Sequence, residues 1–358
     1  MGCVLYLDAD RFYFSVEALE RPELAGDPRP IVIAHDPREA PRAVVTTAND
    51  AARKLGITSA LSALLALRRA PNALFLPPRH DLYASYSRRL MELLRSESQL
   101  VQQNSIDEAA LSWEHQGFAP EPALRLRERI GREIGLSVSL GLAPSPLVGK
   151  MASEVAKGEP SHLRVVRPGE EPAFLAPMPI RALIGVGPKA EERLRGVGVA
   201  TIGDLQAREL AELVEGFGQS YGRYLHRACR GEDDSELSDE REPKSISAER
   251  TFDQDTNDRR RLWQELQGQA EEVAARLRHD ELVAGEVAIK VRYGSWETFT
   301  RQMRLAQPTD QAEALAAGAA ALLRRHWDRS RPIRLLGVRA GRLMHRPAAV
   351  QATLPLDP

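Results

Sequence analysis

The sequence of 358 residues has little cysteine, no long hydrophobic run and almost no net charge. Cys3 and Cys229 have no Cys or His partner at the spacing of metal ligands, so neither a disulfide framework nor a zinc site is indicated, and both are expected to be buried. No apolar run approaches the roughly 20 residues of a membrane span. The N-terminus lacks the basic region and cleavage site of a signal peptide. These absences predict a cytoplasmic protein with no membrane partner.

The net charge of −1 is a mild argument against binding to nucleic acid, because most phosphate-binding proteins carry a basic excess. The argument holds only if the charges are spread evenly. Seven of the 50 acidic residues lie between Gly231 and Lys244, in the stretch GEDDSELSDEREPK, which has no apolar periodicity and is expected to be an extended linker. The objection is therefore weak, and the chain length favours two to four domains.

Two acidic motifs stand next to apolar stretches. Asp8 ends the run Val-Leu-Tyr-Leu and precedes an aromatic cluster, whereas Asp107 and Glu108 lie inside a run that continues to Leu111. Neighbouring residues of a strand face opposite sides, so Asp107 and Glu108 can reach one metal centre only if the backbone bends there or one side chain reaches around an edge. Alone, the Asp-Glu pair is more simply explained as a surface turn with two solvated acids, and the first motif as a capped turn.

Together, the two motifs predict a phosphoryl-transfer site. Strand ends are where α/β proteins present catalytic groups. Three carboxylates from two strand ends are the hard oxygen ligands that two Mg²⁺ ions need in phosphoryl transfer. We therefore predict nucleotidyl transfer, with Asp8, Asp107 and Glu108 as the catalytic residues.

The segment Asp-x-Asp-x-Phe-Tyr at Asp8, followed by Ser-Ile-Asp-Glu-Ala at Ser105, resembles the Y-family translesion DNA polymerases, most closely the DNA polymerase IV type. The resemblance extends over nearly the whole chain. It implies an α+β multidomain protein, with a right-hand polymerase of palm, fingers and helical thumb, plus a βαββαβ little-finger domain. The implied boundaries are palm 1–19 and 78–165, fingers 20–77, thumb 166–230 with a helix-hairpin-helix, linker 231–244, little finger 245–344 and tail 345–358.

The residue pattern adds detail to these domains. The palm is expected to have its helices on one face of a sheet. Within it, Ser137 and Ser139 alternate with apolar residues over 136–142, which predicts a half-buried strand. In the last domain, helices over 258–279 and 309–327 are expected to separate strands in the order β-α-β-β-α-β.

The resemblance also implies roles at the site. Asp8 and Asp107 would bridge two Mg²⁺ ions, Glu108 would hold the ion that activates the primer 3′-hydroxyl, and the carbonyl of Ala9 would contact the nucleotide-side ion. Phe12 and Tyr13 would bind the nucleotide, with Tyr13 as the steric gate that excludes ribonucleotides. The alternative for Tyr13 is a core aromatic residue.

Thr47, Arg53 and Lys157 would bind the triphosphate of the incoming nucleotide. A helix start with a hydroxyl before it and cations behind it is a reasonable phosphate site, although a solvated helix or a macrodipole complement explains the same residues without the family. One departure is Asp50, which occupies a position where the family often has a Tyr that contacts these phosphates. An acid there would repel them, so Asp50 must point away or pair with a cation.

DNA contacts are expected in two places. The Gly-rich turn at Gly185, Gly187 and Lys189 resembles a helix-hairpin-helix, in which glycine lets backbone N–H groups approach a phosphate. In the last domain, one sheet face is expected to carry the basic residues Lys290, Arg292, Arg304 and Arg339, which are otherwise only solvated. Relatives often carry consecutive Arg in the last strand where this chain has Arg334-Leu335.

The C-terminus carries Gln351, Leu354 and Leu356 in the pattern Gln-x-x-Leu-x-Leu, which resembles the bacterial sliding-clamp-binding peptide; the alternative is a frayed tail. The expected function is template-directed, two-metal translesion DNA synthesis by a monomer that binds primer-template DNA, deoxynucleoside triphosphates and a sliding clamp. The rivals are a catalytically inactive accessory protein of the same fold, which binds the clamp and partner polymerases, and a nucleotide cyclase with a similar palm.

Overall fold

The computed structural model describes residues 2–239 and 242–346. The chain forms two compact units: unit 1 is Met1–Glu39 with Ala43–Glu240, and unit 2 is Ala40–Arg42 with Arg241–Pro358. The predicted clamp-binding residues Gln351, Leu354 and Leu356 lie outside the described residues. No helix in the described ranges is long and apolar enough to cross a membrane.

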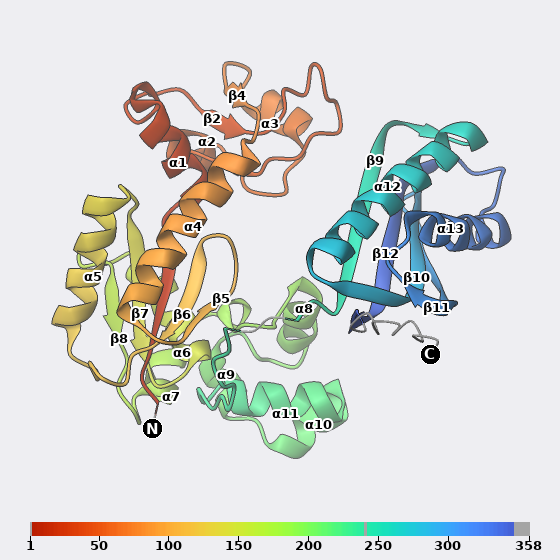
Figure 1. Cartoon of the computed structure of the whole chain (residues 1–358). Coiled ribbons are helices and arrows are strands. Elements are labelled where there is room, and N and C mark those ends of the chain that lie inside the picture. Colours follow the sequence, from red (N-terminus) through yellow and green to blue (C-terminus); the bar gives the residue numbers. More distant parts are fainter. Residues whose placement is uncertain (1, 240–241, 347–358) are drawn as a thin grey trace, which may run out of the picture. The chain divides into compact units, whose positions relative to one another are not determined.

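A five-stranded sheet forms the centre of unit 1 (Figure 1). Its strands are antiparallel except for the last pair. Their order is β5 (Val101–Gln103), β6 (Glu108–Ser112), β1 (Val4–Ala9), β7 (Val138–Ala143) and β8 (Leu163–Val165). β1 therefore lies in the middle, where neighbours on both sides fix the position of Asp8.

Both faces of this sheet are covered by helices. Leu5 and Leu7 belong to a core with buried residues of α4 (His80–Glu97), α5 (Pro120–Glu133) and α1 (Phe12–Glu20). Tyr6 points to the other face and packs against α6 (Pro146–Ala156), where a Cβ on Gly149 would lie 3.1 Å from the Cβ of Tyr6. The expectation of helices on one face is therefore wrong.

The second layer explains why β7 also differs from the prediction. All six of its residues are buried, and Ser139 is fully buried. Gly141 of β7 has no side chain, which lets the backbone of α6 approach closely. The alternation of small and apolar residues therefore records helix packing on both faces of the strand and not a half-buried strand.

A smaller three-stranded sheet follows β1 and α1 in the chain. Its order is β3 (Thr47–Ala48), β2 (Ile31–Ile33) and β4 (Leu74–Leu76), with η1 (Pro22–Leu24), α2 (Asp50–Lys54) and α3 (Ala63–Arg69) in the connections. Asn49 ties α2 to this sheet, because its Oδ1 accepts from the N–H groups of Ala52 and Ile31, both at 3.0 Å. Its side chain fixes the N-terminus of the helix that carries Arg53.

Short helices with a separate core complete unit 1. They are α7 (Glu171–Leu175), η2 (Ile180–Ala182), α8 (Pro188–Gly196), α9 (Ile202–Gln206), α10 (Leu210–Phe217) and α11 (Gln219–Ala228). Residues 232–239 form neither helix nor strand. This stretch is nevertheless attached, because Leu237 packs against Val4 and Tyr6, and Asp233 accepts the N–H of Leu147 at 3.0 Å.

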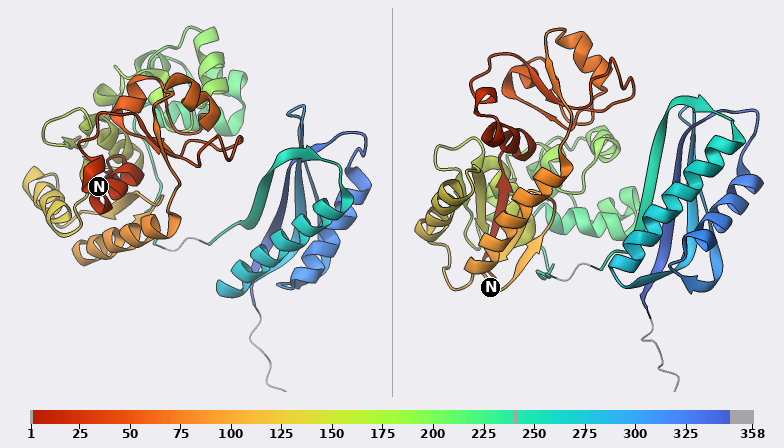
Figure 2. Two further views of the ribbon diagram at one scale, coloured as in Figure 1. Left: turned by 90° about the horizontal axis from the view of Figure 1, so that it is seen from above. Right: turned by 45° about the horizontal axis from the view of Figure 1, so that its top comes forward.

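Unit 2 has the predicted order of elements, and its two helices lie on one face of the sheet (Figure 2). The elements are β9 (Ser245–Thr256), α12 (Arg259–His279), β10 (Leu282–Tyr293), β11 (Thr298–Thr309), α13 (Ala312–His326) and β12 (Ile333–His345). The strands are antiparallel in the order β11, β10, β12, β9. Val287, Ile289 and Val291 of β10 face the helices and are fully buried.

Candidate active site

Asp8 and Glu108 lie directly opposite each other on β1 and β6. The expected bend occurs just before β6. There Ser105 Oγ accepts the N–H of Glu108 at 3.0 Å and donates to Asp107 Oδ1 at 2.5 Å, while the carbonyl of Asp107 accepts the N–H of Ala9 at 3.0 Å. This turn brings the three predicted carboxylates to one end of the sheet without requiring Asp107 to continue the strand.

Two lysines of the α6 region neutralise this acidic pair. Lys157 Nζ lies 3.0 Å from Asp8 Oδ2, and Lys150 Nζ lies 2.8 Å from Glu108 Oε2. The hydroxyl of Tyr6 also donates to Glu108 Oε2 at 2.9 Å. Lys157 had been predicted at the site and Lys150 had not. The signal was present, because positions two helical turns apart share one face.

Burial sets the protonation of the pair. It raises the pKa of Asp8 to about 7, with the nearby carboxylates Glu108 and Asp107 adding to the rise and Lys157 opposing it. Burial acts on Glu108 in the same direction, but hydrogen bonds from Lys150 and Tyr6 outweigh it, so the pKa of Glu108 is lowered. The two carboxylates, each beside a lysine, therefore differ in protonation: Glu108 is ionised at neutral pH, whereas Asp8 is partly protonated there.

The donor set fits hard divalent cations, because it consists of carboxylate oxygens at a strand end. No group of three His, Cys, Asp or Glu side chains converges on a common centre within the part of the chain that the structure describes. Asp107 accepts a hydrogen bond from Ser105. The ammonium groups of Lys150 and Lys157 form ion pairs with Glu108 and Asp8. The predicted ligands are thus close together but not arranged around one point.

A cleft of about 510 Å³ adjoins these residues. That volume lies within the ~300–1,000 Å³ typical of ligand sites. Its lining comprises Asp10, Arg11, Ser15, Asp50, Arg53, Ser137, Glu154, Lys157 and His162. Arg53 and Lys157 therefore line one cleft, although one belongs to α2 and the other follows α6.

Thr47 holds the side chain of Arg53 by a hydrogen bond. Its side chain is buried and its Oγ1 accepts from Arg53 Nη2 at 3.1 Å, while Arg53 Nε donates to the carbonyl of Ala48 at 2.9 Å. Thr47 does not line the cleft. Its place is consistent with positioning the guanidinium of Arg53, and a direct contact between Thr47 and a phosphate stays a prediction.

Asp50 pairs with a cation, as its chemistry required. Arg11 Nη1 lies 2.7 Å from Asp50 Oδ2, and both side chains are about half exposed on the cleft wall. Arg11 adopts a left-handed backbone conformation with φ of 51° just before α1. No pattern in the sequence identifies Arg11 as this cation, because the two residues are far apart along the chain.

The second acid of the Asp-x-Asp motif has different partners from the first. Ser137 Oγ and Ser139 Oγ donate to the carboxylate of Asp10 at 2.7 and 2.8 Å, and His162 Nδ1 lies 3.2 Å from it. Asp10 thereby joins the end of β1 to β7 and to the segment after α6. This role in fixing the cleft wall was missed in the sequence.

Phe12 and Tyr13 lie at the start of α1 and have different surroundings. The ring of Phe12 is 1% exposed and belongs to the core, so any nucleotide contact by Phe12 must come from its backbone. Tyr13 is partly exposed. Its partial burial raises the pKa of its hydroxyl, and the nearby carboxylate of Asp107 adds to the rise. Its ring packs edge-on against Tyr83 with the centroids 4.9 Å apart.

A buried ion pair supports the ring behind Tyr13. Glu17 is fully buried, and its carboxylate accepts from Arg79 Nε at 2.9 Å, from Arg79 Nη2 at 2.5 Å and from Tyr83 OH at 2.7 Å. Burial opposes ionisation, but the bonds from Arg79 and Tyr83 outweigh it and lower the pKa of Glu17. Tyr83 is thereby held in the one orientation that contacts Tyr13.

The Gly-rich segment forms a turn between η2 and α8, and its assignment as a helix-hairpin-helix stays a prediction. Gly185 has φ of 84°, and a Cβ there would lie 3.0 Å from Cε1 of Tyr224, so both conformation and space favour glycine. The hydroxyl of Tyr221 donates to the carbonyl of Gly185 at 2.9 Å. Gly187 is the N-cap of α8, and Lys189 is exposed in its first turn.

The four basic residues predicted in unit 2 share the sheet face opposite the helices. Lys290 and Arg292 alternate with the buried residues of β10. Arg304 lies opposite Glu286 in the strand register, and Arg339 lies opposite Ala288. Two of these cations have carboxylate partners: Lys290 Nζ lies 2.8 Å from Glu249, and Arg339 Nη2 lies 3.3 Å from Glu286. We call this surface the open face of unit 2.

An exposed aromatic residue of unit 2 lies beside two arginines. Trp296, in the turn between β10 and β11, is 63% exposed. The guanidinium carbons of Arg334 and Arg292 lie 4.4 and 5.5 Å from its ring centroid. Arg334, which follows the family pattern only in part, thus stacks on an aromatic ring.

Family models match three parts of the chain. The model of the impB/mucB/samB family matches residues 7–154, and that of the impB/mucB/samB family C-terminal domain matches 243–354. A model of the DNA polymerase-iota thumb domain matches residues 181–233. These matches cover most of the five-stranded sheet, the three-stranded sheet, the helices α8 to α11 and the elements β9 to β12.

Curated relatives are similar over almost their whole length. DNA polymerase IV of Halorhodospira halophila (strain DSM 244 / SL1) is 41% identical over 339 residues, which are 94% of this chain and 93% of that protein. DNA polymerase IV of Methanoculleus marisnigri (strain ATCC 35101 / DSM 1498 / JR1) is 38% identical over 344 residues, covering 95% of this chain and 94% of that protein.

Solved structures have the same fold. The Y-family DNA polymerase chimera Dbh-Dpo4(243-245)-Dbh has a TM-score of 0.85 at 24% identity, covering 96% of this chain and 100% of that one. The insertion ternary complex of Dbh DNA polymerase has a TM-score of 0.67 at 23% identity and covers 96% of this chain and 100% of that one.

Proposed function

This chain belongs to the Y family of DNA polymerases, of the DNA polymerase IV type, and from that premise we propose that the cleft lined by Arg53 and Lys157 is where it adds deoxynucleotides to a primer. It is a DNA-directed DNA polymerase of translesion synthesis with the right-hand fold and a little finger. The observation that supports the site assignment is the placement of Asp8 opposite Glu108 beside that cleft. An inactive accessory protein has no support in these relatives.

We assign the domains as the family pattern implies. Residues 1–19 and 78–165 with the five-stranded sheet form the palm, 20–77 with the three-stranded sheet form the fingers, and 166–230 with α7 to α11 form the thumb. The stretch 231–244 is the linker, 245–344 the little finger and 345–358 the tail. In this assignment the cleft lies between palm and fingers, so that both contribute a cation to it.

The groups that would hold divalent metal are the carboxylates of Asp8, Asp107 and Glu108 and the carbonyl of Ala9. We propose two Mg²⁺ ions, because carboxylate and carbonyl oxygens are the hard ligands that Mg²⁺ prefers. Bound there, the ions supply Lewis acidity, which lowers the pKa of the primer 3′-hydroxyl and neutralises the charge of the in-line transition state.

The remaining roles belong to side chains of the cleft. Arg53, held by Thr47, and Lys157 bind the triphosphate from two sides, because a forked guanidinium and an ammonium both pair with phosphate oxygens. Arg11 neutralises Asp50, so that this acid does not repel the triphosphate. Tyr13, backed by Tyr83, excludes a ribose 2′-hydroxyl.

Two DNA-binding surfaces and a clamp contact complete the proposal. The turn at Gly185 and Gly187 with Lys189 binds a backbone phosphate, and the open face of unit 2 binds the duplex. The tail residues Gln351, Leu354 and Leu356 recruit a sliding clamp. Deleting 351–358 should abolish stimulation by a loaded clamp on a long template; undiminished stimulation would place the clamp contact elsewhere. A monomeric state and a cytoplasmic location stay predictions.

Primer extension tests the function as a whole. The full chain is expected to extend a primer with deoxynucleotides in MgCl₂, on undamaged templates and past some members of a lesion panel, and to stop when EDTA is added. Failure to extend undamaged DNA at any Mg²⁺ concentration, with DNA binding intact, would favour an accessory role. Formation of cyclic nucleotide without a primer would favour a cyclase.

A further inference from the structure

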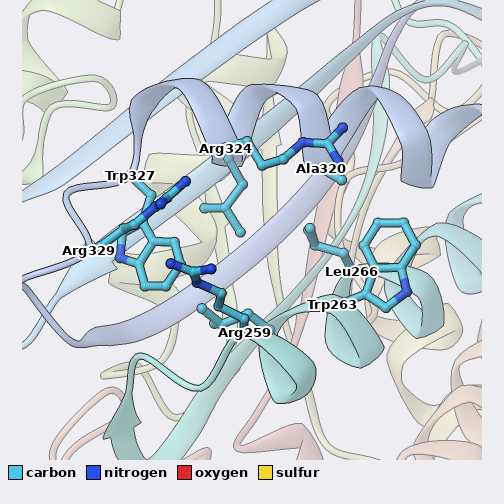
Figure 3. A pocket seen from close by; sticks show the side chains of 9 residues that line it. Arg259, Trp263, Leu266, Ala320, Arg324, Trp327 and Arg329 are labelled. Atoms are coloured by element: carbon cyan, nitrogen blue, oxygen red, sulfur yellow. The ribbon is translucent and has the colours of Figure 1, made fainter.

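A groove lies between α12 and α13, on the side of unit 2 opposite the open face (Figure 3). Its volume is about 220 Å³, and its floor consists of the buried side chains of Leu262, Leu266 and Leu323. Trp327 lies at one end and Trp263 at the other, and Trp263 is 41% exposed. An exposed tryptophan beside a concave apolar floor is more typical of binding surfaces than of ordinary helix faces.

Three arginines surround this floor. Arg259, Arg324 and Arg329 are exposed, and none has a carboxylate within ion-pair distance among the described residues. Among the residues that the structure describes, none of those that line the groove is acidic. Three acids are next in sequence to lining residues, and each has a partner: Asp258 accepts the N–H of Arg260, Asp328 accepts the N–H and hydroxyl of Ser330, and Glu265 pairs with Arg250. The groove is therefore apolar at its floor and positively charged at its rim.

Its size limits what can bind. A volume of about 220 Å³ is below the ~300 Å³ at the lower end of small-molecule sites, but it accommodates a large apolar side chain. The unpaired guanidinium groups favour carboxylates beside that side chain. We propose that this groove binds an acidic peptide segment of a partner protein, with an apolar anchor on Leu262, Leu266 and Leu323 and carboxylates on the arginines.

Two other occupants agree less well with these residues. The chain's own acidic stretch is engaged within unit 1, where Asp233 accepts the N–H of Leu147 and Asp234 pairs with Arg227. Single-stranded DNA would bind the arginines through its phosphates and could stack a base on Trp263, but it has no apolar group that would bury the aliphatic floor. A peptide uses the rim and the floor together.

The experiment measures fluorescence anisotropy of labelled probes with the full chain. The main probe is a peptide rich in Asp and Glu with one central Leu-Phe pair. The comparison probes replace that pair by Ser-Ser, replace the acids by Lys, or are oligo-dT. The main probe should bind in the micromolar range and both changed peptides at least about tenfold more weakly.

Variants locate the binding. Arg324→Glu should weaken the main probe by at least about tenfold, because it places an acid against the peptide carboxylates. The matched control is Arg325→Glu, which makes the same charge change at the neighbouring exposed residue outside the groove and should alter binding by less than about twofold. Primer extension should be unchanged in both. The proposal is overturned if the probe does not bind, if both variants weaken it equally, or if oligo-dT displaces it at lower concentration than the unlabelled peptide does.

Discussion

At the scale of residues, partners decide what each acid of the cleft can do. Burial raises the pKa of Asp8 to about 7, whereas Lys150 and Tyr6 outweigh burial and lower the pKa of Glu108. Asp50 is about half exposed and is neutralised by Arg11. The Asp8 and Glu108 pair therefore differs from Asp50 in burial, although each of the three acids has a cation beside it.

The buried acid Glu17 makes stability depend on pH. Its pKa is lower in the folded chain than the unfolded value of about 4.3, so its contribution is present above that value and is lost as pH falls through the folded pKa. Glu17→Gln should lower the free energy of unfolding by on the order of 2 kcal/mol at pH 7. The deficit should shrink at pH 3.5, as measured by urea unfolding of both proteins. A deficit that is the same at both pH values would show that ionisation of Glu17 does not contribute.

Tyr13 is expected to control sugar selection. Tyr13→Ala removes a ring that packs against Tyr83 near Asp107, so ribonucleotide incorporation relative to deoxynucleotide incorporation should rise at least about tenfold. Tyr13→Phe keeps the ring and should keep the discrimination. Single-nucleotide kcat/KM values for both sugars provide the measurement. An unchanged ratio in Tyr13→Ala would mean that another residue excludes the 2′-hydroxyl.

At the scale of elements, the position of α6 sets the position of both lysines. Gly141→Ala would place a Cβ 2.0 Å from the carbonyl oxygen of Gly149, so α6 must move. We expect a loss of about 1–3 kcal/mol in the free energy of unfolding, together with weakened nucleotide incorporation by the folded fraction. Gly268→Ala in α12 has open space and should be neutral or stabilising. Equal effects of the two substitutions in thermal unfolding would contradict this account of α6.

The elements of unit 2 could be predicted well because their pattern is local. The apolar spacing predicted helices over 258–279 and 309–327, and the structure has Arg259–His279 and Ala312–His326. The layer formed by α6 could not be predicted. Periodicity shows that one face of a helix is buried, but it does not show against which side of a sheet that helix packs.

The site shows the same division. Asp8, Asp107 and Glu108, which two motifs predict as ligands, lie near one another, and Arg53 and Lys157, which the resemblance implies, line one cleft. The pairing of Arg11 with Asp50 and the inward ring of Phe12 depend on contacts between distant segments, which no local pattern encodes.

At the scale of the whole molecule, the net charge of −1 reflects cations that are paired with acids of the same chain. On the open face of unit 2, Glu249 and Glu286 accept from Lys290 and Arg339. Phosphate must replace these carboxylates when the duplex binds, so affinity should be modest and dependent on salt.

Glu249→Gln should therefore raise the affinity for primer-template DNA by about twofold to fivefold, because it frees Lys290. Glu272→Gln is the matched control: it makes the same charge change at an exposed pair with Arg276 on α12, in the helical layer of unit 2. Fluorescence anisotropy with a labelled duplex at low salt measures both. If the two variants gain equally, the effect reflects net charge and not the open face.

The most direct test of the account is the single-turnover rate of nucleotide incorporation by Glu108→Gln, measured by rapid quench at saturating DNA, deoxynucleotide and Mg²⁺. Glu114→Gln, an exposed acid beyond the end of β6, is the control. We predict a rate for Glu108→Gln at least about a thousandfold below wild type, with DNA affinity unchanged, and a wild-type rate for Glu114→Gln. A Glu108→Gln rate within about tenfold of wild type would contradict the assignment of the Asp8 and Glu108 pair as the catalytic centre.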